Sequence, residues 1–504
     1  MNIQNIKNSP QPLAIVDIGS NSVRLVVYED ETRVPAIVYN EKAMCGLGSN
    51  VILTGLLPEE GMASASKAIA RYKKLSEMMG VRNIRIMATA AVRDARNGKE
   101  FLHKVKELWD VPVELVPGER EAYLSSLGII AGFYLPDGVM GDLGGGSLEL
   151  SSISQFVVGN GVSMPLGGLA LRDISGGNLK EAYKFMTKTL KKAGEQIALM
   201  KGRSFYAVGG TWRTLAKIHQ IYSKYPVHFM HGYVMKPDEI IPFLKEIESG
   251  NKYLLDLSDD ISEPRKPLLP YGALVLQELI KQGQPKEIII SSTGVRDGIL
   301  FEHLRHDVQT LDPLSDAIQR ISLRRSRSQE HSYELSQWAR QFIRSTTRNE
   351  FINKDRMIHI MSVLSDISWR SHPDYRAEHA LALVECAYLL GIDHPLRSCL
   401  AITLFCRYAG VNSTDSIPQG MLKVAGDDLV LFARLMAAII RVGYAVSVAT
   451  SGVLPKTPLL LKEGEVVLSL PLEFEQLANG RLLNRLRQLG KILDCQARIE
   501  MNEA

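Results

Sequence analysis

Two short segments of the chain resemble each other, and this repeat constrains the fold more than any other feature. DIGSNSVRL (17–25) and DLGGGSLEL (142–150) share an Asp, the first Gly, a Ser and the final Leu at the same four positions. Each segment joins two apolar runs rich in β-branched residues, a pattern that predicts a strand, a tight turn and a second strand. The repeat therefore predicts two similar blocks, each opened by the same hairpin.

Strand and helix patterns alternate up to about residue 308, and the pattern is helical from Pro313 to about Ala449. Alternation predicts an α/β fold whose sheets are covered on their faces by helices, including a helix over 58–80 and another over 179–200. The segment 455–504 has the pattern of a hairpin, a helix and a final strand. We therefore predict four domains: an α/β lobe over 1–128, a second α/β lobe over 129–307, an all-helical domain over 308–450 and a small α+β domain over 451–504.

The composition is that of an ordinary soluble protein of 504 residues with a formal net charge of +4. This mild positive charge fits an anionic partner but does not select nucleic acid. The five cysteines are scattered and lack metal-type spacing, which argues against a disulfide framework and favours a reducing cytoplasm.

Neither the N-terminal segment nor the most apolar stretch of the sequence predicts an association with a membrane. The N-terminal segment MNIQNIKNSPQP lacks the hydrophobic stretch of a signal peptide. The longest apolar stretch (429–449) contains Arg434 and Arg441, seven residues apart. Two arginines on one helical face make a buried helix a better prediction than a membrane span. We expect a cytoplasmic protein with no membrane partner.

The composition of the two turns suggests what they bind. Glycines let a backbone approach a ligand and turn its N–H groups toward a phosphate, while the Asp places a carboxylate beside them, where it can hold Mg²⁺. Two facing turns would hold consecutive phosphates of one ligand; the alternative is a pair of ordinary hairpins. No G-x-x-x-x-G-K-[ST] loop is present. The expected phosphate-binding residues of the turns are Gly19, Ser20, Asn21, Ser22, Gly144, Gly145, Gly146 and Ser147.

Six motifs occur in order over the first 305 residues: DIGSNSVRL, TAAVRDARNG (89–98), VPGEREAYLSSLGI (116–129), DLGGGSLEL, YAVGGTWRTLA (206–216) and STGVRDGILFEHL (292–304). The paired turns resemble the phosphate loops of the actin-like, sugar-kinase and acetate-kinase superfamily. The full set resembles the exopolyphosphatase/guanosine pentaphosphate phosphatase (Ppx/GppA) family in its long form. The resemblance implies two ribonuclease H-like (actin-like ATPase) lobes, an all-α HD-like domain, a small α+β tail and a homodimer.

Three acidic residues are the candidates for chemistry. Glu121 precedes an Ala where the resemblance implies a catalytic base; alternatively, Glu119 and Glu121 only offset a helix dipole. Asp142 and Glu149 lie on adjoining strands, where a hairpin can bring both carboxylates to one edge and bind Mg²⁺, with Mn²⁺ as a possible substitute. Asp17 is the equivalent of Asp142 in the first lobe and a third metal candidate, or else a cap for its own turn.

Two further segments are candidates for phosphate binding. Arg93 is expected in a loop after the strand IRIMAT, where its guanidinium could bind phosphate in a bidentate manner, as the resemblance implies. The alternative is an ion pair with Asp94 or Glu100. Gly209, Gly210 and Thr211 begin a helix after a strand, so they offer an anion-binding N-terminus.

The predicted helical domain carries a basic cluster and no recognisable metal site. A working HD site needs a His and an adjacent His-Asp pair, and the helix AITLFCRYAG (401–410) offers neither. We therefore expect no second metal-dependent site there. A charge cluster is often only a solvated helix face, but it could also form part of a polyphosphate channel. Its members are Arg320, Arg324, Arg325 and Arg327.

These patterns favour a Mg²⁺-dependent exopolyphosphatase that releases orthophosphate from inorganic polyphosphate in a cleft between two lobes. The closest alternative is a guanosine pentaphosphate (pppGpp) phosphatase with the same site, and the sequence does not separate the two. An ATP-dependent phosphotransferase and a non-catalytic phosphate-sensing module are further alternatives. The expected partners are polyphosphate or pppGpp, and no nucleic acid.

Overall fold

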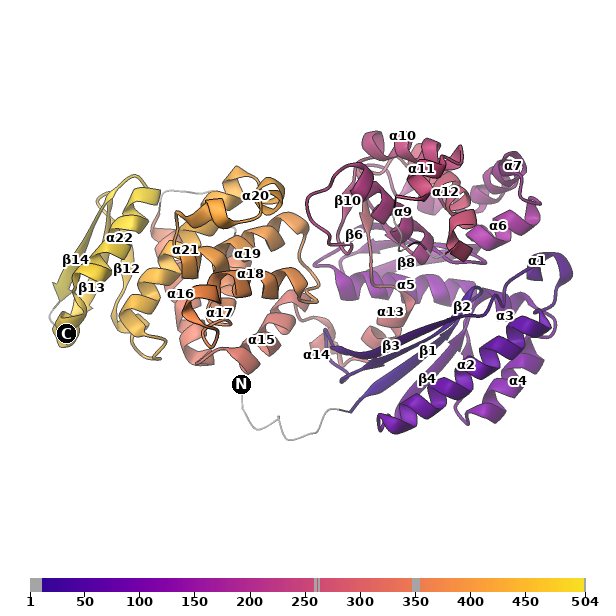
Figure 1. The fold of residues 1–504 in the computed structure, drawn as a ribbon, viewed down its shortest axis with the longest axis horizontal. Coiled ribbons are helices and arrows are strands. Elements are labelled where there is room, and N and C mark those ends of the chain that lie inside the picture. The colour runs from indigo at the N-terminus through magenta and orange to yellow at the C-terminus, as the bar shows by residue number, and fades with distance from the viewer. Residues whose placement is uncertain (1–10, 258–260, 262, 347–353, 503–504) are drawn as a thin grey trace. The chain divides into compact units, whose positions relative to one another are not determined.

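The computed structural model describes residues 11–502 except for 258–260, 262 and 347–353. The chain forms two compact units that divide between Pro313 and Leu314. We call them the N-terminal unit and the C-terminal unit and describe each separately (Figure 1).

The first sheet of the N-terminal unit has five strands in the order β3-β2-β1-β4-β5. β1 is antiparallel to β2 and parallel to β4, which is parallel to β5. Alternate residues of β1 face opposite sides because strand side chains have a period of two. Val16 packs with α2 and α4, whereas Ile15 packs with α5 and with α13 (Val295–Glu302). The elements are β1 (Leu13–Ile18), β2 (Ser22–Tyr28), β3 (Ile37–Met44), α1 (Val51–Thr54), α2 (Glu59–Met78), β4 (Asn83–Ala88), α3 (Ala90–Asp94), α4 (Gly98–Leu108), β5 (Val113–Leu115) and α5 (Gly118–Gly132).

The second sheet repeats this order with one added edge strand, β8-β7-β6-β9-β11-β10. β6 is antiparallel to β7 and parallel to β9, as β1 is to β2 and β4. The two α/β lobes predicted from the repeated turn are confirmed. The elements are β6 (Asp137–Leu143), β7 (Leu148–Ser154), β8 (Val157–Met164), α6 (Gly168–Ile174), α7 (Leu179–Leu190), α8 (Gly194–Ala198), β9 (Ser204–Val208), α9 (Gly210–Tyr222), β10 (Val234–Met235), α10 (Pro237–Glu248), α11 (Lys252–Leu255), α12 (Leu269–Gly283), β11 (Glu287–Ile290), α13 (Val295–Glu302) and α14 (His306–Gln309).

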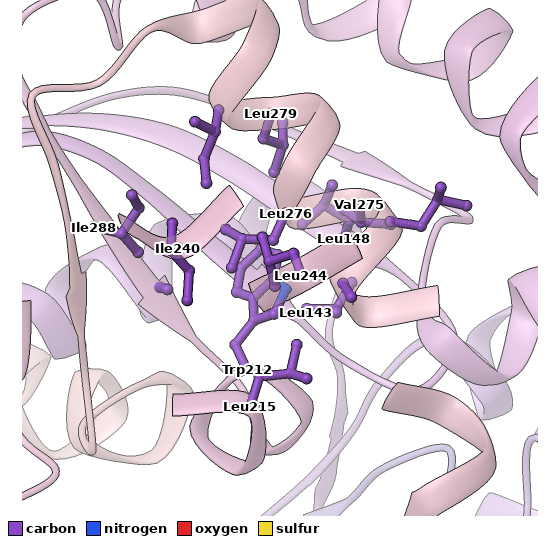
Figure 2. Packing of buried hydrophobic residues seen from close by; sticks show 14 of the residues in the cluster. Leu143, Leu148, Trp212, Leu215, Ile240, Leu244, Val275, Leu276, Leu279 and Ile288 are labelled. Carbon is purple, nitrogen blue, oxygen red and sulfur yellow. The ribbon is translucent and has the colours of Figure 1, made fainter. Parts of the chain in front are cut away.

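The core of the second lobe surrounds Trp212, which lies among Leu143, Leu148 and Leu276 (Figure 2). The indole Nε1 donates a hydrogen bond to the Gly272 carbonyl at 3.0 Å, so its polar group is satisfied inside the core. This core fixes α9 against the sheet and thereby places the start of α9 beside the end of β6.

The continuous helix predicted over 179–200 is wrong. The structure ends α7 at Leu190, continues with a 3₁₀ turn over Lys191–Ala193 and restarts as the short helix α8 at Gly194. The apolar pattern continues through this break because Ala193 and Ile197 remain in the same core as Leu190.

Helices α5 and α13 cross between the two sheets (Figure 1). Leu124 of α5 packs with β1 of the first lobe, whereas Ala122 and Ile129 pack with β6 and β9 of the second. The boundary predicted between residues 128 and 129 therefore falls inside a helix that serves both lobes. The crossing is close, since a Cβ at Gly298 would lie 1.8 Å from the Leu124 carbonyl oxygen.

We expect Gly298→Ala to lower the free energy of unfolding by about 1–3 kcal/mol, because the added methyl group must push α13 away from α5. Gly194→Ala is the matched control: it lies at helical φ with no atom within 4 Å of its Cβ position. This control should be neutral or stabilising by about 0.4–1 kcal/mol. Calorimetric melting of both variants tests the crossing, and equal melting temperatures would contradict it.

The C-terminal unit is helical and ends in a three-stranded sheet of order β12-β13-β14. This confirms the helical region and the small α+β tail, whereas the HD-like relationship stays a prediction. The elements are α15 (Pro313–Arg325), α16 (Gln329–Ser345), α17 (Asp355–Leu364), α18 (Arg376–Cys386), α19 (His394–Ala409), α20 (Gln419–Ala425), α21 (Asp427–Ser447), β12 (Leu459–Lys462), β13 (Glu465–Pro471), α22 (Gly480–Ile492) and β14 (Gln496–Asn502).

Among the described residues, α21 alone is long and apolar enough to cross a membrane by length and composition. However, 67% of the most apolar 18-residue segment of this helix is buried within the protein, which is the burial expected of a core helix. All five cysteines are free in this structure.

Candidate active site

The two repeated turns have the same backbone structure. Gly19 N–H donates to the Ser22 carbonyl at 3.0 Å, and Gly144 N–H donates to the Ser147 carbonyl at 2.9 Å. Each turn therefore closes in the same way, and the side chains on its two strands take equivalent places.

The residues opposite each other differ between the two hairpins. Asp142 on β6 pairs directly with Glu149 on β7, as the sequence predicts, whereas Asp17 on β1 pairs with Arg24 on β2. Cross-strand neighbours on one face lie about 4.5–5.5 Å apart at Cβ. The second hairpin therefore brings two acids together, and the first brings together an acid and a base.

The two turns also face each other across the lobes. A Cβ at Gly146 would lie 2.9 Å from Ser20 Oγ, and one at Gly145 would lie 3.2 Å from Ser20 Cβ. A side chain at Gly146 would therefore collide with the opposite turn. The absence of side chains in the second turn is what allows this approach.

A cleft of about 1390 Å³ opens beside the facing turns. Glu149 and Arg93 lie outside its lining, but the structure brings every other predicted residue of the two α/β lobes to this cleft. These residues are Asp17, Gly19, Ser20, Asn21, Ser22, Glu121, Asp142, Gly144, Gly145, Gly146, Ser147, Gly209, Gly210 and Thr211.

Glu121 lies in the first turn of α5 with 12% of its side chain exposed. Burial raises the pKa of this carboxyl well above its usual value, and the negative charges of Glu149 and Asp142 raise it further. Arg93, whose Nη1 lies 3.3 Å from Glu121 Oε2, acts in the opposite direction. The cleft therefore holds a carboxyl group whose proton affinity is unusually high for a glutamate.

The other two acids are held by serine hydroxyls. Ser125 Oγ donates to Asp142, and Ser163 Oγ donates to Glu149 at 2.6 Å. Glu149 is only 1% exposed, and burial together with the charge of Asp142 raises its pKa to about 8. Burial likewise raises the pKa of Asp142. Three carboxyl groups thus repel one another in one buried region.

Arg93 is not in a loop as predicted but in the short helix α3. It pairs with Asp94 at 3.1 Å, which was the alternative drawn from the sequence, and also with Glu121. The segment between β4 and α4 is helical because the Thr89 carbonyl accepts hydrogen bonds from the N–H groups of Val92 and Arg93.

The cleft also contains basic residues that sequence reasoning did not assign. Arg24 belongs to the first turn motif, Arg213 to the motif GGTWRTLA and Arg296 to STGVRDG, so their motifs could have identified them. No local pattern marks Lys42 or Arg265, because the fold alone brings their segments to the cleft. Arg296 Nη1 lies 2.8 Å from Asp17 Oδ2, so Asp17 is held by an ion pair and is not a cap for its own turn.

The basic residues lower one another's pKa. Burial and the positive charges of Arg265, Arg24 and Arg213 together lower the pKa of Lys42 to about 8. Burial also lowers the pKa of Arg213 to about 10. Such a group of like charges is stabilised when an anion enters the cleft.

The four arginines of the predicted basic cluster belong to the C-terminal unit. Arg320 lies 3.4 Å from Asp316, and Arg327 binds Asp366 through two contacts of 2.7 and 2.8 Å. Arg324 and Arg325 are exposed at the end of α15. At least two of the four therefore have carboxylate partners, and the polyphosphate channel stays a prediction.

Comparison with known proteins identifies the family. The model of the Ppx/GppA phosphatase family matches residues 25–307, more than half of the chain. The chain belongs to the Ppx/GppA phosphatase family. A second model, of the C-terminal region of exopolyphosphatases, matches residues 314–499.

Individual relatives are distant. Exopolyphosphatase 1 of Mycobacterium tuberculosis is 24% identical over 307 residues, covering 58% of this chain and 88% of that protein. A bifunctional 3-dehydroquinate synthase/phosphatase of Fusobacterium nucleatum is 24% identical over 314 residues, 57% of this chain but only 46% of its own length. Among solved structures, an exopolyphosphatase from Cytophaga hutchinsonii has a TM-score of 0.52 at 20% identity, covering 58% of this chain and 97% of its own. This likeness supports the two-lobed, actin-like fold of the Ppx/GppA phosphatases.

We expect the affinity of the cleft for tripolyphosphate to fall as the pH rises through about 8, because Lys42 then loses its charge. Lys42→Gln should weaken binding about tenfold at pH 7, equal to about 1.4 kcal/mol, and Lys42→Arg should keep the affinity up to pH 9. Calorimetric titration without a divalent cation measures both effects.

Lys67→Gln is the matched control, because this lysine is exposed on α2 of the same lobe. An identical pH profile in wild type and Lys42→Arg would show that Lys42 does not contact the anion.

Proposed function

We propose that the protein is an exopolyphosphatase that hydrolyses the terminal phosphoanhydride of inorganic polyphosphate. The proposal rests on one observation: two facing glycine-rich turns, a buried acid and a group of basic residues line the same cleft. Backbone N–H groups and guanidinium groups suit a ligand with several phosphates, and the acid suits the activation of water. Membership of the Ppx/GppA phosphatases and the named exopolyphosphatase relatives support this assignment.

Glu121 is the proposed general base. It takes a proton from a water molecule as the water oxygen attacks the terminal phosphorus, and the bond from that phosphorus to the bridging oxygen breaks. The products are orthophosphate and a chain shortened by one unit. A base works best when its pKa lies near the working pH, and burial beside two acids moves Glu121 in that direction.

The two turns and the basic residues hold the substrate. The amides of Gly144–Ser147 and Gly19–Ser22 would bind oxygens of the terminal phosphates, and Arg24, Arg213 and Lys42 would neutralise the following ones. Arg93 acts through Glu121: its contact favours the charged carboxylate and fixes its position.

A divalent cation fits the acids of the second hairpin. No group of three or more His, Cys, Asp or Glu side chains is arranged to hold a metal in the part of the chain described here. Mg²⁺, however, often binds one or two carboxylates and completes its shell with water and substrate phosphates. Asp142 and Glu149 would hold it, whereas Asp17 is engaged by Arg296. The bound ion would neutralise charge on the phosphoryl group.

The alternative substrate is pppGpp, and one observation favours it. Beyond the turns the cleft is lined by apolar side chains, among them Ile221, Tyr225, Pro226 and Leu257. A purine ring packs well against such a surface. Release of orthophosphate from long-chain polyphosphate and from pppGpp, measured side by side at equal phosphate concentration, decides between the two substrates.

Glu121→Gln should lower kcat by about 10²–10⁴-fold, because the amide cannot accept the proton of the attacking water. Glu119→Gln is the matched control, since Glu119 lies on the same helical turn but is exposed. Phosphate release measures both. Unchanged turnover in Glu121→Gln would remove it from the reaction, and an equal loss in the control would assign the effect to the helix dipole.

Chelation with EDTA should abolish phosphate release, and added Mg²⁺ should restore it. Asp142→Asn should raise the Mg²⁺ concentration for half-maximal activity by at least about tenfold, because it removes a carboxylate ligand. Asp137→Asn, at the far end of the same strand, pairs with Arg203 and should leave the Mg²⁺ dependence unchanged. Activity that survives EDTA would exclude the metal requirement.

A further inference from the structure

A second group of arginines lies in the C-terminal unit, outside the cleft. Arg407 lies close to the end of α19, and Arg441 lies in the last third of α21. Arg481 and Arg485 both lie on α22. We call these four residues the arginine cluster. It includes a residue of the AITLFCRYAG helix, in which an HD-type site would need its metal ligands.

Backbone contacts hold three of the four arginines next to one another. Arg441 Nη1 donates to the Arg407 carbonyl at 2.9 Å, near the carbonyl end of α19, and Arg485 Nη1 donates to the Arg441 carbonyl at 2.7 Å. Each guanidinium is therefore tied to the backbone of the next arginine. The cluster is built by three packed helices and does not depend on one flexible loop.

The cluster has little negative charge to balance it. Asp366, only 2% exposed, is bound by Arg327 through both oxygens and lies 3.7 Å from Arg407. Burial and three charged neighbours, all of them arginines, together lower the pKa of Arg485 to about 10: they are Arg441, Arg481 and Arg407. The pKa of Arg441 is lowered by burial and by Arg407 in the same way.

Two donors of the cluster are buried without a partner. Among the described residues, the Nε atoms of Arg407 and Arg441 are shielded from solvent and make no hydrogen bond. Arg407 is also packed over the rings of Tyr444 at 4.0 Å and Tyr408 at 4.3 Å, which fixes the plane of its guanidinium. A buried donor without an acceptor is destabilising, and repulsion between like charges adds to that cost.

A purely structural role does not account for this arrangement. One arginine is enough to bind the carbonyl end of α19, and Arg441 does so. Arg407 contacts Asp366 and Arg485 donates to the Arg441 carbonyl, but the positive charges of the cluster still repel one another, and a bound anion would relieve that repulsion. A tetrahedral oxyanion accepts several hydrogen bonds and supplies the missing negative charge.

We propose that the arginine cluster is a binding site for a phosphate group, separate from the cleft. The group is either free orthophosphate or one phosphate of a polyphosphate chain. Binding at this site can be measured without turnover, so the inference does not depend on the proposed function.

Equilibrium dialysis of the full-length protein with radiolabelled orthophosphate tests the site. We expect Arg485→Gln to bind one equivalent of phosphate per chain fewer than wild type, or to bind that equivalent at least about tenfold more weakly. Arg485→Lys should retain most of the affinity. Arg487→Gln, two residues further along the same helix and exposed, is the matched control and should bind as wild type does.

Two further readouts separate binding from misfolding. Phosphate should raise the melting temperature of wild type more than that of Arg485→Gln, and kcat for tripolyphosphate should be the same in both. If Arg485→Gln does not fold, the exposed Arg481→Gln takes its place and should weaken phosphate binding severalfold. Unchanged binding of both orthophosphate and long-chain polyphosphate in the folded variant would overturn the proposal.

Dialysis at equal phosphate content with long-chain polyphosphate, on ice and in EDTA, distinguishes the two sources. If the variant loses the binding of orthophosphate, the arginine cluster is a site for the free ion. If the variant loses only the binding of the polymer, the cluster is a site for a phosphate of the polyphosphate chain. If Arg485→Gln changes only the oligomeric mass in light scattering and binds both probes as wild type does, the cluster is a contact between copies and the proposal is wrong.

Discussion

The close approach of two glycine-rich turns is the constraint on which the site depends. Ser20 of the first turn lies against Gly145 and Gly146 of the second so closely that a methyl group at Gly146 would meet Ser20 Oγ. Each turn is closed by its own backbone hydrogen bond. The close approach determines the distance between the amide groups of the first turn and those of the second. One ligand can therefore contact both turns.

The helices between the sheets hold this approach in place. α5 packs with both lobes and carries Glu121 in its first turn, while α13 crosses α5 where glycines replace side chains and carries Arg296, the partner of Asp17. The acid and the turns are therefore positioned by the same two helices. A movement of α5 relative to α13 would change the distance from Glu121 to both turns at once.

The fold could be predicted from the sequence because the repeated turn and the alternation of strands and helices are local patterns. The pairing of Asp142 with Glu149 followed from the same hairpin. The break after Leu190 could not be predicted, since Leu190, Ala193 and Ile197 keep an uninterrupted apolar pattern on both sides of it. Lys42 and Arg265 could not be assigned either, because only the folded chain brings these distant segments together beside Arg24.

The difference between the two hairpins explains how a duplicated fold can form an asymmetric site. The same cross-strand position is Arg24 in the first lobe and Glu149 in the second, each opposite an aspartate. In the first lobe Arg24 and Arg296 surround Asp17, so its charge is balanced by the protein. On the side of the second lobe, the charge of Asp142 raises the pKa of Glu149, and both acids raise the pKa of Glu121, whose basic partner is Arg93. One lobe therefore favours the phosphates of an anionic ligand, and the other favours a cation and a proton acceptor. Two identical hairpins would offer only one of these environments, whereas hydrolysis of a phosphoanhydride needs both.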